Sequence, residues 1–142
     1  MTSGNRANTI YTVEYMATVQ EGILSLVIKS NLKQGNEPQR VIVQTYNYDL
    51  RNNKEINLKE ILAIRKLEET KVKEAINKEI KFQHDKAVDL KELGLTIYDR
   101  DPSSDIYELE NSTEFYVTGD TLYIIYAYGN ANLTSETDLI IF

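Results

Sequence analysis

A lone histidine is the first residue in this sequence that could do chemistry. His84 is the only histidine, and Asp85 follows it directly. A histidine oriented by a carboxylate can act as a general base. The same residue near the end of a helix can simply carry a proton and interact with the negative end of the helix dipole. We favour the second interpretation, because no Gly-x-Ser-x-Gly turn is present to supply a nucleophile. A hydrolase that uses His84 is kept as an alternative.

An acidic stretch is the second candidate for chemistry. Asp99, Asp101 and Asp105 place three carboxylates within seven residues. Calcium prefers oxygen ligands of this kind. However, the stretch lacks the glycine of an EF-hand loop, and Pro102 restricts its backbone. We therefore expect a solvated acidic loop and keep calcium binding as the alternative.

The sequence lacks the residues that zinc sites and phosphate-binding loops require. The sequence has one histidine and no cysteine, so the usual zinc sets cannot form. Its six glycines are scattered and make no phosphate-binding loop. We predict no catalytic residue, no metal and no cofactor, and we do not expect an enzyme.

Length and charge narrow the class of protein. The chain has 142 residues, which suits one domain, and a formal net charge of -6. Nucleic acid is therefore not an expected partner, because phosphate binding needs clustered Lys and Arg. No apolar run approaches the roughly 20 residues that cross a bilayer, so no transmembrane segment is predicted. We interpret residues 1–8 as a disordered or expression-derived N-terminus and residues 9–142 as a single domain.

Three strands are predicted in the first third of the chain. The stretches Ile10–Val19, Ile23–Leu32 and Val41–Leu50 alternate between apolar and polar residues, which is typical of strands with one buried face. Their short connections favour an antiparallel meander. The side chains expected to face the core are Tyr11, Val13, Tyr15, Ala17 and Val19 in the first strand, Leu24, Leu26, Ile28 and Leu32 in the second, and Ile42, Tyr46, Tyr48 and Leu50 in the third.

Helices are predicted in the middle and strands again at the end. Asn57 and Glu60 resemble a capping box that starts a short helix. Apolar residues at spacings of three and four predict a longer helix over Glu68–His84, and a further short helix over Lys86–Gly94 ends at a glycine. Closing strands are expected at Glu114–Thr118, Thr121–Tyr128 and Leu139–Phe142, the first two joined by a Gly119-Asp120 turn. The prediction is an α+β fold: an antiparallel sheet, made of an N-terminal three-strand meander, a C-terminal hairpin and a final strand, packed against a helical middle segment.

Several of these stretches, in order, resemble one family. The matching residues are Ile23-Leu24-Ser25-Leu26, Tyr46-Asn47-Tyr48-Asp49-Leu50 and the segment Lys54–Leu62, followed by the long helix, the hairpin and the last strand. Together they resemble the RsiV-like C-terminal domain, a domain of unknown function found in anti-sigma-V factors and in some peptidoglycan or polysaccharide deacetylases. The resemblance covers nearly the whole chain from about Tyr11. It departs from the family in the Lys33–Gln39 loop, which has no Gly-Gly-Ala-His sequence, and in Tyr126–Asn132, which has no Pro-Tyr pair.

The resemblance implies a location and a type of role. It implies an extracytoplasmic domain, secreted or membrane-anchored at the surface of a Gram-positive bacterium. It also implies a non-catalytic binding or sensing module for a protein ligand, basic and lysozyme-like, or for a cell-wall glycan. The expected surface is made by the Gln34–Gln39 loop, the Tyr98–Glu110 loop and the Tyr128–Thr137 segment. Its candidate residues are Gln34, Asn36, Glu37, Asp99, Asp101, Asp105, Tyr126, Tyr128 and Asn130. A structural module that pairs through an edge strand is a further alternative.

Overall fold

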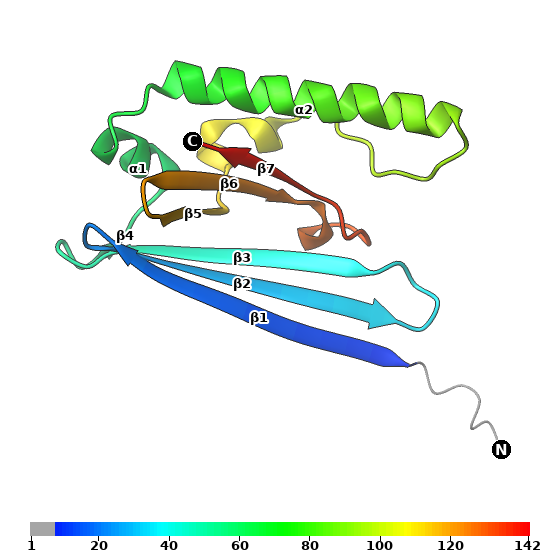
Figure 1. Cartoon of the computed structure of the whole chain (residues 1–142), viewed down its shortest axis with the longest axis horizontal. Coiled ribbons are helices and arrows are strands. Elements are labelled where there is room, and N and C mark those ends of the chain that lie inside the picture. The colour runs from blue at the N-terminus through cyan, green and yellow to red at the C-terminus, as the bar shows by residue number, and fades with distance from the viewer. Residues whose placement is uncertain (1–7) are drawn as a thin grey trace.

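The computed structural model describes residues 8–142 and arranges them in three tiers (Figure 1). Helix α2 (Glu69–Glu92) forms one outer tier. The middle tier, named the C-terminal sheet, has the strand order β5-β6-β7 and consists of β5 (Phe115–Thr118), β6 (Thr121–Ala127) and β7 (Thr137–Ile141). The other outer tier, named the N-terminal sheet, has the order β1-β2-β3-β4 and consists of β1 (Thr9–Gln20), β2 (Ile23–Gln34), β3 (Arg40–Asp49) and β4 (Lys54–Glu55). The predicted α+β class is confirmed, and the strands divide between two antiparallel sheets.

The first hairpin is long and regular. Strand β1 pairs with β2 without a bulge, from Thr9 opposite Gln34 to Gln20 opposite Ile23. Glu21 and Gly22 connect the strands, and both have positive φ angles of 51° and 81°. Two residues with positive φ form the type of turn whose twist matches that of the flanking strands. The predicted turn is therefore confirmed.

Both helices begin or end where their local sequence predicts. Helix α1 (Leu58–Ile64) has the predicted capping box, in which the Asn57 side chain accepts from the Glu60 backbone N–H and the Glu60 carboxylate accepts from the Asn57 N–H. Helix α2 continues through His84 and joins the two predicted helices into one. It ends at Glu92, and Gly94 follows with a positive φ of 84°; Leu95 N–H then donates to the Leu90 carbonyl in the pattern of a Schellman motif. Neither α-helix of residues 8–142 is long and apolar enough to cross a membrane.

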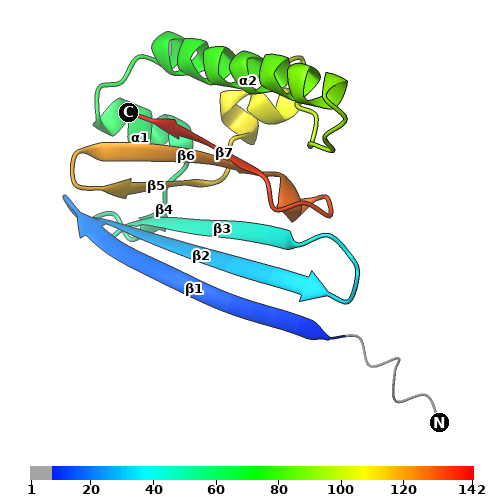
Figure 2. The ribbon, with the colours of Figure 1, turned by 45° about the vertical axis from the view of Figure 1, so that its right-hand side comes forward.

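Short 3-10 turns complete the fold. They are η2 (Asp105–Tyr107), η3 (Leu109–Asn111) and η4 (Tyr128–Asn130). Figure 2 shows η2 and η3 beneath α2, on the same side of the C-terminal sheet as both helices.

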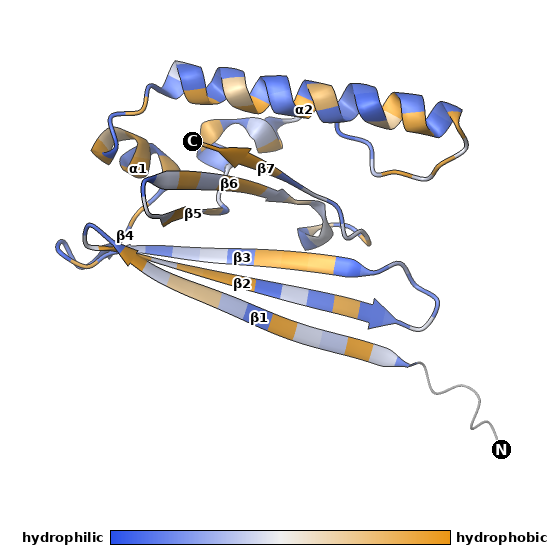
Figure 3. Cartoon of the chain, in the orientation of Figure 1, coloured by the Kyte–Doolittle hydropathy of each residue, from blue (hydrophilic) through white to orange (hydrophobic). Residues whose placement is uncertain are grey.

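The hydrophobic core lies between the C-terminal sheet and the helices. Most of its members come from α1, α2, the 3-10 turns and the three C-terminal strands, and Ile23 of β2 and Ile56 before α1 complete it. Val72, Ile76 and Ile80 form the stripe by which α2 contacts this core, and Figure 3 shows the alternation of hydrophobic and hydrophilic residues along the helix. Each fully buried aliphatic side chain contributes about 1.5–3 kcal/mol. The helical segment thus covers one face of the C-terminal sheet.

The N-terminal meander buries the opposite face from the one predicted. Tyr15, expected in the core, is 78% exposed, and Tyr11, Val13 and Val19 are also exposed. Apart from Ser30, the buried residues of this sheet belong to the other side of each strand and include Ser25, Val41, Val43, Asn47 and Asp49. The predicted strands and their alternation are correct, but the assignment of the apolar face to the core is wrong.

Hydrogen bonding explains why the face that carries Thr18, Ser25 and Asn47 turns inward. The edge of β5 meets the face of the N-terminal sheet, where Thr18 Oγ1 donates to the Val117 carbonyl at 2.6 Å. Val117 N–H donates to Ser25 Oγ at 3.1 Å, and Asn47 Nδ2 donates to the Phe115 carbonyl at 2.7 Å. A strand edge buried without partners costs free energy, so polar side chains are required at this contact. An apolar face could not supply hydrogen-bond partners for the edge of β5.

Candidate functional site

The structure gathers most of the predicted surface at one end of the molecule. The Gln34–Gln39 turn, the loop after α2 and the segment after β6 all lie toward the right-hand end in Figure 1. Arg40 ties two of them together, because its guanidinium donates to the carbonyls of Gly129 and Asn130. Asp105 lies nearer the middle, in η2. We call this end the loop end.

A buried arginine holds the acidic loop in place. Arg100, only 5% exposed, forms a bidentate salt bridge with Asp138, in which the Nε–Oδ2 and Nη2–Oδ1 distances are both 3.0 Å. Its Nη1 contacts Glu136 Oε1 at 2.7 Å and the Tyr98 carbonyl at 2.8 Å. Its guanidinium also lies 5.0 Å from the centre of the Tyr128 ring. Burial lowers the pKa of Arg100, but the hydrogen bonds to the two carboxylates outweigh burial, so the net shift is upward.

A chain of tyrosine hydroxyls extends this cluster into the core. Tyr128 donates to Asp138 Oδ2 at 2.6 Å, and the Tyr107 hydroxyl lies 2.7 Å from the Tyr128 hydroxyl. Burial raises the pKa of Tyr107 to about 12 and also raises that of Tyr128, whose hydrogen bond to Asp138 adds to the effect. Tyr126 pairs instead with Ser112, at 2.7 Å, and burial raises its pKa to about 12. These hydroxyls are protonated donors and acceptors within the fold at neutral pH.

Asn130 joins the segment after β6 to the free edge of β3. Its side-chain oxygen accepts from Val43 N–H at 2.9 Å, and its amide nitrogen donates to the Val43 carbonyl at 2.8 Å. Gly129 lies so close to β3 that a Cβ there would be 1.9 Å from the Val41 carbonyl oxygen. Three predicted site residues, Tyr126, Tyr128 and Asn130, thus support the loop end through contacts inside the fold.

A cleft of about 350 Å³ lies between these segments. Its wall includes the ring of Tyr98, which stacks on Tyr128 with 4.5 Å between ring centres, and the amide of Asn132, 3.3 Å from the Tyr98 hydroxyl. We call it the loop-end cleft; it is lined by Tyr98, Ser104, Ile106, Asn111, Ser112, Thr113, Glu114, Ile125, Tyr126, Ala127, Tyr128, Asn130, Ala131 and Asn132. It combines aromatic and apolar walls with amides and hydroxyls, which is the usual composition of a small-ligand site.

The three carboxylates of the acidic loop have separate surroundings. Asp99 contacts both His84 Nδ1 and Lys91 Nζ at 3.3 Å. Asp101 accepts from the hydroxyl and the backbone N–H of Ser103, and these bonds lower its pKa. Within residues 8–142, no three His, Asp or Glu side chains are grouped so as to hold a metal ion.

His84 lies on α2 beside the acidic loop. Its Nδ1 is 2.7 Å from the Arg100 carbonyl oxygen and 3.3 Å from Asp99 Oδ1. Neither the loop-end cleft nor the second cleft described below is lined by His84. The ring therefore contacts the loop that follows the helix.

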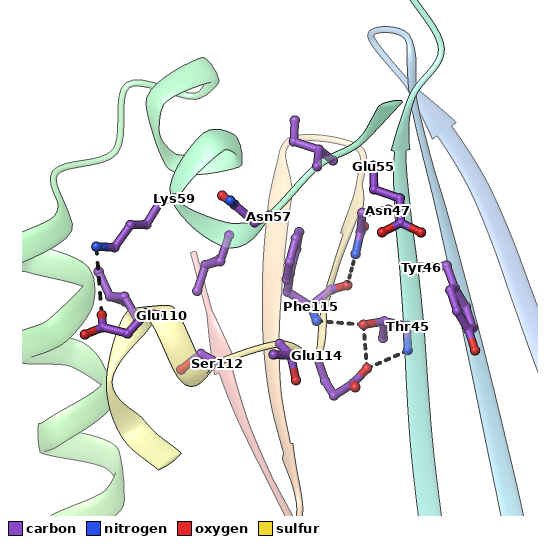
Figure 4. A pocket seen from close by; sticks show the side chains of 14 residues that line it. Thr45, Tyr46, Asn47, Glu55, Asn57, Lys59, Glu110, Ser112, Glu114 and Phe115 are labelled. Carbon is purple, nitrogen blue, oxygen red and sulfur yellow. Dashed lines mark hydrogen bonds and ion pairs between the residues drawn. The ribbon is translucent and has the colours of Figure 1, made fainter. Parts of the chain in front are cut away.

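A second cleft, of about 420 Å³, was not anticipated from the sequence (Figure 4). It lies between β3–β4 on one side and the residues from η3 to β5 on the other. Glu114 Oε2 accepts from the N–H and the hydroxyl of Thr45, at 2.5 and 2.7 Å. On the opposite wall, Lys59 of α1 lies 3.8 Å from Glu110 (Figure 4). The polar residues at alternate positions of β3, Thr45 and Asn47, were the available signal, but alternation alone indicates a solvent-facing side.

Comparisons with protein families and with curated proteins identify no relative of this chain. A scan against protein-family models and a search of curated proteins both found no match. The resemblance to the RsiV-like domain accordingly stays a prediction from the residues quoted above.

Proposed function

We propose that this chain is a non-catalytic binding or sensing domain. Following the resemblance, it would belong to a bacterial surface or membrane-anchored protein and work outside the cytoplasm. Its ligand would be a basic, lysozyme-like protein or a cell-wall glycan. The loop end is the proposed binding surface.

The observation that carries the proposal is the rigid support of an exposed acidic loop. Arg100 fixes the loop to Asp138 of β7 and to Glu136 just before that strand, while Asp101, at the next position, is exposed. Glu37 is exposed in the turn at the same end (Figure 1). Fixed loops lose less entropy on binding than mobile ones. Exposed carboxylates on a chain of net charge -6 speed the approach of a basic partner.

The loop-end cleft supports a glycan as the alternative ligand of the same surface. Sugar rings bury their apolar faces on aromatic side chains, and Tyr98 offers a half-buried ring at the cleft wall. The amide of Asn132 beside it can donate to a hydroxyl group. A volume of about 350 Å³ is at the lower end of the range for small-ligand sites.

A structural role through an edge strand has its own supporting observation. β1 ends the N-terminal sheet and is paired on one side only. Its twelve residues include no proline and no lysine, and Glu14 is their single charged residue. Proteins usually protect such edges with charges, prolines or bulges. The hydrolase alternative has weaker support, because the His84 ring contacts a backbone carbonyl and lines neither cleft.

Calorimetric titration of lysozyme and of soluble peptidoglycan fragments tests the proposal. The site variant is Glu37→Gln/Asp101→Asn at the loop end. The matched control is Glu21→Gln/Asp120→Asn, which removes two exposed carboxylates from turns at the other end of the sheets. The site variant should weaken lysozyme binding by about five-fold at low salt, as expected for exposed charges, and the control should change it little.

A glycan ligand predicts a different response. The charge variants should then leave affinity nearly unchanged, and Tyr98→Ala should abolish binding to the fragments. Absence of binding to both ligands would refute the proposal. Equal weakening by the site and control variants would show that net charge, rather than the loop end, attracts the partner.

A further inference from the structure

The N-terminal sheet has an apolar face that no other part of residues 8–142 covers. Thr18, Ser25 and Asn47 point toward β5, as their hydrogen bonds show, so their neighbours along each strand point the other way. We call this side the outer face. Its residues are Tyr11, Val13, Tyr15, Ala17 and Val19 of β1, Leu24, Leu26, Ile28, Ser30 and Leu32 of β2, and Arg40, Ile42, Gln44, Tyr46 and Tyr48 of β3.

These side chains form continuous cross-strand rows. Val19 lies opposite Leu24, which lies opposite Tyr48, and Ala17, Leu26 and Tyr46 make the next row. The most exposed members lie on β1: Tyr15 at 78%, Val19 at 62% and Tyr11 at 60%. Aromatic side chains cover 150–250 Å² each, so the exposed parts of this face amount to on the order of 600 Å². That is the upper limit for a patch on a typical monomer and near the roughly 800 Å² that each partner buries in a standard interface.

Charge indicates which partner suits the face. Arg40 is its single charged residue, and its guanidinium turns away to the Gly129 and Asn130 carbonyls. The face therefore carries almost none of the net charge of -6. A strongly charged partner would find no complementary group here. A second copy would bring an equally uncharged surface, so repulsion between two acidic chains would be least along this face.

Shape also suits a second copy. The outer face is three strands wide, with β1 and β2 twelve residues long and β3 ten, and the β1–β2 pairing has no bulge. Two such sheets can pack face to face, about 10 Å apart and about 30° from parallel. A two-fold axis makes the contact self-complementary, because the same rows meet on both sides.

We propose that two copies of this chain associate by packing their outer faces together. The resulting dimer buries the exposed tyrosines and valines of β1 in a sheet-on-sheet interface. The loop-end cleft is built on the other side of the N-terminal sheet, from residues 98–132, and stays accessible. This inference stands independently of the ligand proposed above.

Sedimentation velocity of the full chain, from low to high micromolar concentration, tests the dimer. The mass should rise from one chain to two with concentration. Tyr15→Glu should weaken self-association about thirty-fold or more, as for a tyrosine that an interface buries. Met16→Glu is the matched control: it adds the same charge at the next residue of the same strand, where Met16 is 41% exposed on the opposite face. Circular dichroism should show unchanged folding for both variants.

Three results would overturn the proposal. If the wild-type chain stays monomeric at all concentrations, the outer face does not bind a second copy. A dimer that Tyr15→Glu does not weaken would have its interface elsewhere. Equal weakening by Tyr15→Glu and Met16→Glu would indicate pairing along the β1 edge instead of packing through the face, since both residues lie on that edge.

Discussion

Replacing Arg100 by methionine removes the cation at the centre of the buried cluster while keeping most of the side-chain volume. Asp138, whose side chain is 2% exposed, then loses both guanidinium contacts and keeps the Tyr128 hydroxyl. Glu136 is partly exposed and can be rehydrated, so most of the cost falls on Asp138. Removing one partner of a buried pair typically costs about 3–5 kcal/mol. Since domains of this size are stable by about 5–15 kcal/mol, the variant should lose a large part of its stability.

Urea unfolding followed by circular dichroism at neutral pH measures this loss. The double variant Arg100→Met/Asp138→Leu should recover part of it, because no buried charge is then left alone. Lys73→Met is the control: Lys73 lies 3.3 Å from Glu108 in an exposed pair, and its loss should cost under about 0.5 kcal/mol. A loss below about 1 kcal/mol for Arg100→Met, or a double variant less stable than the single one, would refute the reasoning.

Three further predictions concern packing, hydrogen bonding and pH. Gly129→Ala should cost about 3 kcal/mol in thermal unfolding, because its Cβ would overlap the Val41 carbonyl; a cost below about 1 kcal/mol would mean that the backbone adjusts freely. Ser25→Ala should cost about 1–3 kcal/mol, because Val117 N–H loses its buried acceptor, and wild-type stability in this variant would contradict the role given to the polar inner face. Burial raises the pKa of Tyr126 to about 12, above the value near 10 of an unfolded chain, so its contribution is present below about pH 10 and lost as the pH rises through about 12. The free energy of unfolding of Tyr126→Phe should therefore fall less steeply with pH, between about pH 10 and 12, than that of wild type. Equal slopes for the two proteins would contradict a raised pKa of Tyr126.

Much of the fold was predictable because it depends on local interactions. The Glu21-Gly22 turn and the Asn57 capping box each involve groups within a few residues. The end of α2 likewise depends on Gly94, two residues beyond the helix, because glycine tolerates a positive φ. The boundary predicted after His84 was wrong, since Ala87 continues the buried stripe of α2.

The loop end was only partly predictable. The sequence identified its segments, but Arg100 was not singled out, although it is the residue that holds the acidic loop. Its partners Glu136 and Asp138 lie far along the chain, and no spacing links them to it. The tyrosines expected on the surface, Tyr126 and Tyr128, form part of the buried hydroxyl network for the same reason.

By itself the sequence determined the elements, the alternation of the strands and the apolar character of one face of the meander. Only the tertiary structure decided which face is buried. Local alternation records the chemistry of each side but not what packs against it. The edge of β5 needs hydrogen-bond partners, and Thr18, Ser25 and Asn47 supply them, so the polar face turns inward. The apolar face is consequently left uncovered within residues 8–142.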